Sequence, residues 1–301
     1  MKIASIRQKK LITAIKTPYL KNGEIDVEVF DNLVERQIKN GVEGIVVGGT
    51  TGEGHLLSWE DHLMLIAHAS HKFGSRLMIV GNTGSNNTKE SFQATAHGFN
   101  AGMHVALLIN PYYGKTSLDG LLVHFKECLK LGPAIIYNVP MRTAQDIPKE
   151  VITELADCSP NLVGVKECMG TERISEYYAN GIFCWVGVDE QTFKAYHKCH
   201  ALGVISVASN IVPGLMRKLL DTKDEVFEQS LHPFFRWLGI EPNPIPLNSI
   251  LADLRLTKPV FRLPYCPLSY ELRKKGVDLL KKIDPSFANA EILLDDKFIS
   301  T

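Results

Sequence analysis

The chain has 301 residues, which is enough for one large domain or for a barrel with an appendage. Its 33 Lys and Arg balance its 33 Asp and Glu, so no basic excess points to nucleic acid or to an anionic membrane as a partner. No apolar run reaches the roughly 18–20 residues that a membrane-spanning helix needs, and the content of hydrophobic residues, 45%, is typical of a globular domain.

Short apolar runs rich in Val and Ile recur along the chain and predict buried strands. They are Leu11–Ile15, Gly44–Val47, Leu77–Val80, Val105–Ile109, Ala134–Ile136, Leu162–Val165, Ile182–Val186 and Gly203–Val207. Continuous apolar runs of this length suit strands that are covered on both faces, as in a parallel sheet.

Segments with helical periodicity lie between these runs. The clearest are Val27–Ile38, Trp59–His68, Thr88–Phe99 and Leu118–Leu129. Ser58 stands at the N-cap position of the second segment, and the acidic Asp61 follows at the capping-box position.

Strands that alternate with helices in this way predict an α/β fold, a (β/α)8 TIM barrel, over residues 1–230. Residues 231–301 contain Pro-rich stretches and three segments of helical pattern, so we predict a C-terminal helical domain there. A doubly wound open sheet is the alternative fold, but the chain shows neither the glycine fingerprint nor the switch point that it requires.

Active sites of such barrels lie at the carboxyl ends of the strands, and this rule selects candidates without reference to any family. The strand ends carry an amine at Lys166, a phenol at Tyr137, hydroxyls at Thr50 and Thr51, and a guanidinium at Arg142. A lysine that is partly desolvated at a barrel mouth has a lowered pKa, and its free amine condenses with a ketone to a Schiff base. The alternative for Lys166 is a solvated strand end.

The neighbouring candidates have alternatives of their own. Tyr137 could exchange protons with an imine, with Thr50 or Thr51 as a relay, or it could be an ordinary amphipathic residue at the rim. Arg142 suits the capture of a carboxylate, or it is a solvated loop arginine. The glycine-rich residues 48–54 could cradle a phosphate or form a tight turn without a ligand, and they lack the GK[ST] and GxGxxG spacings.

Two further pairs follow the second and third strands. Trp59 and His62 lie one helical turn apart, and Asn86 and Glu90 are four residues apart. Core packing accounts for the first pair, and a pair on a helix surface accounts for the second, without any ligand.

The six cysteines and the first ten residues bear on the compartment. None of the cysteines forms a CxxC motif, and we expect reduced, mostly buried thiols in a reducing compartment. The N-terminal residues MKIASIRQKK lack an apolar core, which argues against a secretory signal. They are too short for a full transit peptide, although a mature form without its presequence would look the same.

Six segments together resemble the dihydrodipicolinate synthases (4-hydroxy-tetrahydrodipicolinate synthases). This family belongs, with the N-acetylneuraminate lyases, to the pyruvate-dependent Schiff-base lyases. The segments are GGTTGEG (48–54), INPYYGK (109–115), IYNVPMRT (136–143), GVKE (164–167), GVISVASN (203–210) and EPNPIP (241–246). The resemblance runs from Ile12 to about Pro267, and ITAIKTPYL, GTTGEGHLLSW and FRLPYCPL look closest to the plant branch.

The resemblance implies roles for four residues in catalysis. Lys166 would form an imine with pyruvate, and Tyr137 and Thr50 would belong to a proton relay. Tyr113 would complete that relay from a neighbouring subunit, so the site would need a dimer, and we expect a homotetramer built from dimers.

The resemblance also implies how the substrates would be held. Thr51 would bind the pyruvate carboxylate, Arg142 would bind the carboxylate of L-aspartate 4-semialdehyde, and Ile205 would contribute to substrate binding. The implied reaction is a class I aldol condensation in lysine (diaminopimelate) biosynthesis. No metal and no organic cofactor would be needed, since the lysine itself serves as the electron sink.

Members of the family that respond to L-lysine bind it at a subunit interface, and the resemblance implies such an allosteric site here. The matching positions are Gly54, His55, Trp59, His62, Asn86, Glu90 and Tyr112. If the chain is a plant protein that has lost its transit peptide, the compartment would be the chloroplast stroma, and otherwise the cytoplasm.

Three departures from the family pattern bear on efficiency and inhibition. Met141 and Ala144 replace the first and last residues of the usual SRTG turn, and Val188 stands where Asn or Asp is common. His55 stands where plant members often have glutamine.

Two other functions remain to be weighed against the synthase. One is another pyruvate-dependent lyase acting on a sugar acid, against which Arg142 argues. The other is a barrel that only senses small carboxylates, against which the set of Lys166, Tyr137 and Thr50 argues.

Overall fold

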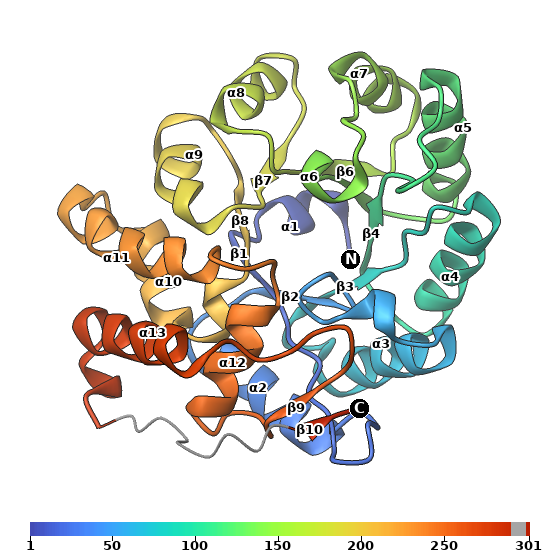
Figure 1. Cartoon of the computed structure of the whole chain (residues 1–301). Helices are drawn as coiled ribbons and strands as arrows, with labels where there is room; N and C mark the ends of the chain where they lie inside the picture. The colour runs from blue at the N-terminus through green and yellow to red at the C-terminus, as the bar shows by residue number, and fades with distance from the viewer. Residues whose placement is uncertain (290–298) are drawn as a thin grey trace.

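Eight parallel strands close into a barrel in the computed structural model, which describes residues 1–289 and 299–301 (Figure 1). The strands are β1 (Leu11–Ala14), β2 (Gly44–Val47), β3 (Met78–Asn82), β4 (Val105–Ile109), β5 (Ala134–Asn138), β6 (Leu162–Glu167), β7 (Cys184–Val186) and β8 (Gly203–Ser206). β1 pairs with both β2 and β8, and this second pairing closes the sheet. The predicted TIM barrel is confirmed.

Helices accompany the strands, and most of these helices form the outer ring. They are α1 (Ile3–Arg7), α2 (Val27–Lys39), α3 (Trp59–Phe73), α4 (Thr88–Asn100), α5 (Leu118–Leu129), α6 (Pro140–Thr143), α7 (Lys149–Cys158), α8 (Thr171–Ala179), α9 (Thr192–Lys198) and α10 (Pro213–Asp221). Single 3₁₀ turns η1 (Gly54–Leu56), η2 (Asp189–Gln191) and η3 (Ala208–Asn210) follow β2, β7 and β8.

Local sequence explains where the helices begin. The Ser58 hydroxyl accepts a hydrogen bond from the backbone nitrogen of Asp61 at 3.1 Å, so the predicted cap of α3 is confirmed. Asp26 caps α2 in the same way, accepting from the backbone nitrogen of Val29 at 3.2 Å. A cap of this kind contributes about 1 kcal/mol to helix stability.

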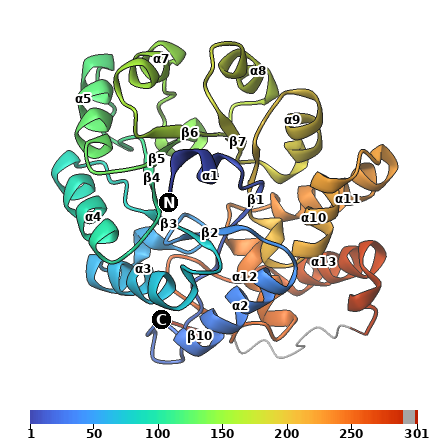
Figure 2. The same cartoon turned by 180° about the vertical axis from the view of Figure 1, so that it is seen from behind.

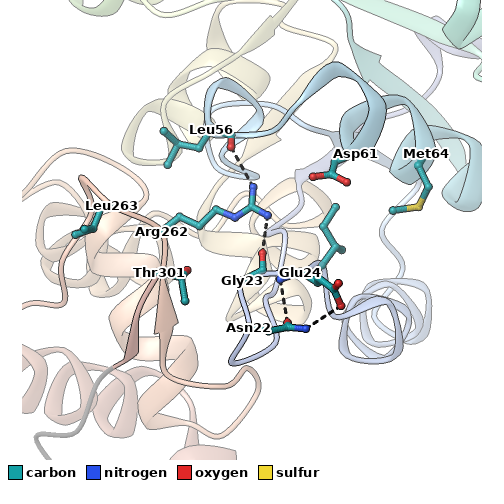
Figure 3. Close-up of a pocket in the computed structure, with 10 residues that line it drawn as sticks. Asn22, Gly23, Glu24, Leu56, Asp61, Met64, Arg262, Leu263 and Thr301 are labelled. Carbon is teal, nitrogen blue, oxygen red and sulfur yellow. Dashed lines mark hydrogen bonds between the residues drawn. The ribbon is translucent and has the colours of Figure 1, made fainter.

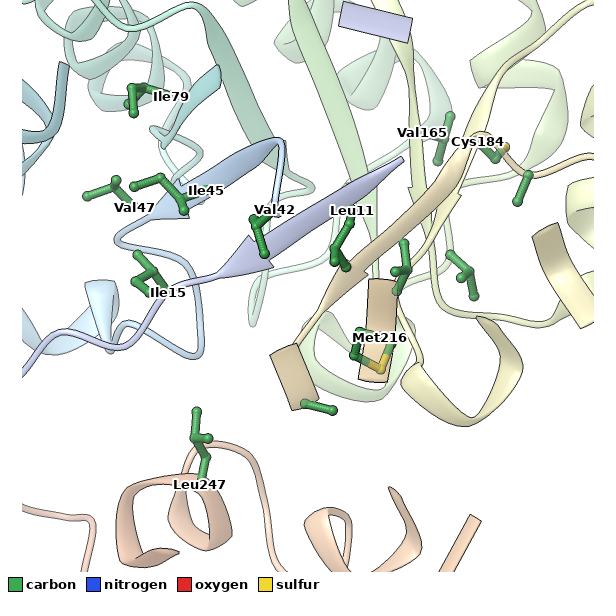
Figure 4. Close-up of a cluster of buried hydrophobic side chains, with 14 of the residues drawn as sticks. Leu11, Ile15, Val42, Ile45, Val47, Ile79, Val165, Cys184, Met216 and Leu247 are labelled. Carbon is green, nitrogen blue, oxygen red and sulfur yellow. The ribbon is translucent and has the colours of Figure 1, made fainter. Parts of the chain in front are cut away.

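Alternate strand residues face two different apolar layers, as a strand period of two requires. In β2, Ile45 and Val47 pack against the outer helices, whereas Val46 points into the barrel. Figure 4 shows part of the outer layer, with side chains from β1, β2 and β6 together with Met216 of α10. Both faces of the strands are therefore buried, which is why the strands read as continuous apolar runs.

The amino ends of the strands are covered by the N-terminal segment (Figure 2). Ile6 of α1 is fully buried in the inner layer, and the Nε of Arg7 donates to the carbonyl oxygen of Val163 at 2.9 Å. Trp185 donates from Nε1 to the carbonyl oxygen of Lys9 at 2.7 Å. These contacts close this end of the barrel.

The C-terminal part contains α11 (Glu225–Leu238), α12 (Ile245–Asp253) and α13 (Tyr270–Ile283), in agreement with the three predicted helical stretches. The 3₁₀ turn η4 (Pro285–Phe287) follows α13. The predicted boundary after residue 230 falls within α11, and the division into two domains stays a prediction. Residues 290–298 of the predicted second domain lie outside the described residues.

Arg262 ties the C-terminal part to the first loops of the barrel. Figure 3 shows its guanidinium donating to the carbonyl oxygens of Leu56, at 3.0 Å, and Gly23, at 2.6 Å. Nearby, β10 (Ile299–Ser300) pairs in parallel with β9 (Val260–Phe261). The hollow beside Arg262, of about 680 Å³, is open and shares no residue with the cavities described below.

The cysteines are free, as predicted, but they are less buried than predicted. Cys128, Cys184 and Cys199 are buried, whereas Cys158 and Cys266 are exposed, so the expectation of mostly buried thiols is wrong for these two. Within residues 1–289 and 299–301, no helix has the length and apolar character needed to cross a membrane.

Candidate active site

A cavity of about 560 Å³ opens at the carboxyl ends of the strands. Its walls come from the ends of β2, β5 and β6, from α6, and from the segment that joins α11 to α12. The lining residues used below are Gly49, Thr50, Thr51, Tyr137, Arg142, Lys166, Cys168, Gly187, Val188 and Asn243. The structure therefore brings together five of the residues selected from the sequence, namely Thr50, Thr51, Tyr137, Arg142 and Lys166.

Lys166 lies at the centre of this cavity. It is the partner of Tyr137 in the β5–β6 register, and its Nζ lies 4.2 Å from the centroid of the Tyr137 ring. Only 6% of Lys166 is exposed, so the alternative of a solvated strand end is wrong. Burial is the main effect and lowers the pKa of the amine; Cys168 and Asp189 oppose it, and the cationic Arg142 adds a smaller lowering.

The next residue, Glu167, explains why the lysine faces the lumen. Successive side chains of a strand point to opposite faces. Glu167 is fully buried on the other face, where its Oε1 accepts from the backbone nitrogens of Cys168 and Met169 at 2.8 Å each. Asn138 donates to both of its oxygens at 3.2 Å. This carboxylate shapes the turn after β6 and fixes the direction of Lys166.

Tyr137 supplies the phenol beside the amine. It is 6% exposed and belongs to the inner apolar layer. Burial raises the pKa of its hydroxyl well above the usual value, and a hydrogen bond with Thr50 opposes that rise. At neutral pH the phenol is therefore a proton donor, and Thr50 is positioned to exchange the proton with it.

Cys168 and Gly187 complete the surroundings of the lysine, and sequence reasoning missed both. Burial raises the pKa of the Cys168 thiol to about 11, so the sulfur is neutral beside Lys166 and Tyr137. A Cβ atom on Gly187 would lie 2.4 Å from Cys168 Sγ and 3.0 Å from Lys166 Cε. Only glycine leaves room for the lysine stem here.

The two candidate carboxylate binders are joined by a third missed residue, Asn243. Its Nδ2 donates to Thr51 Oγ1 at 3.0 Å, and its backbone oxygen accepts from Nη2 of Arg142 at 3.0 Å. Thr51 is buried, whereas Arg142 is exposed at the rim of the cavity. The EPNPIP segment carried the signal for Asn243, but nothing in its spacing indicates which strand it meets.

Two residues of the expected site lie outside the cavity lining. Ile205 is fully buried on β8 in the inner layer of the barrel. Tyr113 is 93% exposed, in the loop after β4, with a positive φ of 72°. Its phenol points away from the interior of its own chain, so any contribution to a site requires another molecule.

A second cavity, of about 420 Å³, adjoins the first. It contains six of the seven predicted allosteric residues, namely Gly54, His55, Trp59, His62, Glu90 and Tyr112. The seventh, Asn86, is exposed and donates from Nδ2 to the carbonyl oxygen of Tyr112 at 3.5 Å. Gly49, Thr50 and Arg142 line both cavities.

The rings of Trp59 and His62 form one wall of the second cavity. They stack at 5.2 Å between centroids with an interplanar angle of 12°. Burial lowers the pKa of His62 to about 4, so the ring is neutral at physiological pH. A Cβ on Gly48, whose φ is +66°, would lie 1.8 Å from Nε2 of His62, which explains the glycine at this position.

Other polar groups complete this second cavity. His55 bonds through Nε2 to the hydroxyl of Tyr265 at 2.8 Å. Glu90 accepts at Oε2 from the Ser85 hydroxyl at 2.9 Å. α4 begins at Thr88, so Asn86 precedes the helix, and its interpretation as part of a helix-surface pair is wrong.

The departures noted in the sequence have structural consequences. Ala144 ends α6 in the left-handed region of backbone conformation, with a φ of 58°. This conformation is less stable for alanine by about 1–2 kcal/mol, a penalty that glycine does not have. The chain thus keeps the backbone of the glycine turn next to Arg142. Val188 lines the first cavity, and Met141 is 96% exposed at its rim.

Comparisons with known proteins agree with this geometry. The model of the Dihydrodipicolinate synthetase family matches residues 7–283. The chain is 52% identical over 299 residues to the chloroplastic 4-hydroxy-tetrahydrodipicolinate synthase of Nicotiana tabacum, which covers 98% of this chain and 83% of that protein.

Two solved structures are similar as well. The first is the chloride-inhibited dihydrodipicolinate synthase of Acinetobacter baumannii complexed with pyruvate. It has a TM-score of 0.87 and 33% identity, and the match covers 91% of this chain and 98% of that one. The second is the DHDPS of Cyanidioschyzon merolae with lysine bound. It has a TM-score of 0.87 and 26% identity, and the match covers 92% of this chain and 98% of that one.

Proposed function

This chain belongs to the Dihydrodipicolinate synthetase family, and we propose that its first cavity condenses pyruvate with L-aspartate 4-semialdehyde as a 4-hydroxy-tetrahydrodipicolinate synthase. The single observation that carries the proposal is the buried amine of Lys166, with a lowered pKa, facing Tyr137 in a cavity of suitable size. The name of the tobacco relative and the pyruvate complex of the Acinetobacter enzyme support the choice of substrates.

The reaction begins with the free amine of Lys166. Its Nζ attacks the ketone carbon of pyruvate, and the carbinolamine loses water to give an imine. The imine withdraws electrons, so a methyl proton leaves and an enamine forms. The enamine carbon then attacks the aldehyde of the second substrate, and the aldehyde oxygen takes up a proton.

Release of the product regenerates the lysine. The amino group of the condensed substrate attacks the imine carbon, and the carbon–nitrogen bond to Lys166 breaks as the ring closes. Tyr137 and Thr50 move the protons that these steps require, with Tyr113 of a neighbouring subunit as the third member of the relay. The reaction needs neither a metal nor an organic cofactor, because the protonated imine is the electron sink.

Two groups hold the carboxylates of the substrates. Thr51, buried at the cavity wall, binds the pyruvate carboxylate, and Arg142, at the rim, binds the carboxylate of the aldehyde substrate. Ile205 supports the floor from the inner layer of the barrel.

The second cavity is the proposed site of feedback inhibition by L-lysine. Glu90 offers a carboxylate to an ammonium group, and Trp59 and neutral His62 offer ring faces. Lysine bound to the Cyanidioschyzon enzyme supports the choice of ligand. Thr50 and Arg142 line both cavities, so a ligand in the second can act on residues of the first.

Assembly and compartment follow from the same proposal. The exposed Tyr113 favours a dimer in which each subunit completes the site of the other, and a tetramer would be built from such dimers. The tobacco relative is named chloroplastic, which supports the chloroplast stroma as the compartment.

A coupled assay tests the proposed function. Purified protein is given pyruvate with aspartate semialdehyde or with a sugar aldehyde, and each reaction is run with and without L-lysine. We expect turnover with aspartate semialdehyde only, inhibited by lysine. Turnover with the sugar aldehyde would instead identify another pyruvate-dependent lyase, and no turnover with either would favour a carboxylate sensor.

A further inference from the structure

We propose that Asn243 is a positioning residue that fixes the Thr51 hydroxyl as a hydrogen-bond donor toward the carboxylate of the first substrate. The inference rests on the proposed function, because it concerns how that substrate is held. It adds a residue of the α11–α12 segment to a site otherwise built from the barrel.

The contact that carries the inference crosses most of the chain. Nδ2 of Asn243 lies 3.0 Å from Oγ1 of Thr51, although the two residues are 192 positions apart. Thr51 is 2% exposed and Asn243 is half-buried, so solvent does not compete freely for this bond. Both residues line the cavity that holds Lys166.

The direction of this bond determines what Thr51 has left to offer. An amide nitrogen only donates hydrogen bonds, so the threonine oxygen is the acceptor. The hydroxyl has a single proton, and among the described residues no other hydrogen bond of Thr51 Oγ1 is found. That proton remains free for an acceptor in the cavity, and a carboxylate is an acceptor only. Asn243 thus leaves the proton of the Thr51 hydroxyl available to bind an anion.

The same residue also contacts the second carboxylate binder, but through its backbone. Nη2 of Arg142 donates to the carbonyl oxygen of Asn243 at 3.0 Å. A substitution of the Asn243 side chain keeps this carbonyl and removes only the contact with Thr51. Substitutions of this side chain therefore test how the first substrate is bound without removing the backbone contact to Arg142.

Asn243→Asp is the informative variant, because it nearly preserves shape and reverses the bond. A carboxylate only accepts, so it would take the Thr51 proton that the substrate needs. Since hydrogen bonds to charged groups are among the stronger ones, we expect the KM for pyruvate to rise about tenfold or more. Asn243→Ala leaves the hydroxyl free to rotate, and we expect a rise of only about threefold. The KM for aspartate semialdehyde should change little in Asn243→Ala, which adds no charge and keeps the carbonyl that Arg142 contacts.

A new carboxylate could also change the KM for pyruvate through its charge, because Lys166, Arg142 and Glu241 lie in the same cavity. Combining Asn243→Asp with a second substitution at Thr51 controls for this effect of charge. With Thr51→Val no proton is left to misdirect, and Asn243→Asp should add little to the KM for pyruvate. With Thr51→Ser the hydroxyl is kept, and the effect of Asn243→Asp should return. Thermal melting of each variant checks that the fold persists.

The outcomes separate this role from the proposed function. An active wild type whose Asn243→Asp and Asn243→Ala variants share its KM for pyruvate would overturn the role of Asn243 alone. An effect of Asn243→Asp of equal size in the Thr51→Val background would also overturn it. A wild type with no condensation activity would refute the proposed function, and the role of Asn243 with it.

Discussion

A buried ion pair that holds the segment after β2 gives the sharpest prediction about stability. Lys16 and Glu53 form a salt bridge, and they are 2% and 0% exposed. Nδ2 of Asn248 also donates to Glu53 Oε1, at 2.6 Å. Glu53 lies between Thr51 of the first cavity and Gly54 of the second, so this pair fixes the segment that serves both.

Glu53→Gln keeps the shape of the side chain but leaves the amine of Lys16 buried without its anion. Breaking a buried pair in this way costs about 3–5 kcal/mol, which is a large part of the roughly 5–15 kcal/mol that stabilises a typical protein. The double variant Lys16→Met/Glu53→Gln removes both charges. It should recover most of the loss, because an uncharged pair carries no uncompensated charge.

The stability of Glu53→Gln should also depend on pH in a specific way. Burial lowers the pKa of Lys16, and Glu53 provides the main opposing effect. In Glu53→Gln the pKa falls further, so between that lowered pKa and the ordinary one the unfolded chain binds a proton at Lys16 that the folded chain lacks. Stability of this variant should therefore rise with pH up to about 10.4, the ordinary value for lysine.

Urea unfolding of the wild type and the variants at matched subunit concentration measures these differences. Lys16→Met completes the double-mutant cycle. The reasoning fails if Glu53→Gln is as stable as the wild type. It also fails if the double variant is less stable than Glu53→Gln, or if the pH dependence of Glu53→Gln has the opposite sign.

Three further predictions concern the cavities. Lys166→Met should abolish turnover and stabilise the fold at neutral pH, since burial lowers the pKa of Lys166. This gain should shrink toward pH 10.4, and melting scans would show it. If Lys166→Met still catalysed the reaction, the proposed imine on Lys166 would be contradicted. Gly187→Ala should lower kcat by about 10²-fold, a loss that small misplacements of a reacting group produce, because its Cβ meets Cys168 and Lys166. An unchanged kcat would mean that the lysine stem has room. Trp59→Arg should keep kcat and weaken lysine inhibition, measured by titrating lysine into the assay. If the wild type ignores lysine, the regulatory proposal fails.

The barrel could be predicted because each strand is buried on both faces and stands out as an apolar run. The outer helices could be predicted for a related reason, since one face of each carries the apolar period. Boundaries were less certain. α4 begins at Thr88 because Asn87 caps it, and this excluded Asn86 from the helix.

The site was harder to predict because burial at a strand end depends on distant segments. Lys166 could be solvated or buried until α6 and residues 238–243 were seen to wall its cavity. Asn243 was missed because its partner, Thr51, lies on the other side of the sequence. Nothing in the sequence sets Gly187 apart from other loop glycines, because its role depends on Lys166 and Cys168, which occupy the space of its missing side chain.

The most direct test of the central claim is the covalent trapping of pyruvate. The protein is incubated with pyruvate, reduced with borohydride, digested and mapped by mass spectrometry. A reduced adduct on the peptide that contains Lys166, lost in Lys166→Met, is the predicted result. An intact peptide with no adduct, or an adduct on another lysine, would contradict the account.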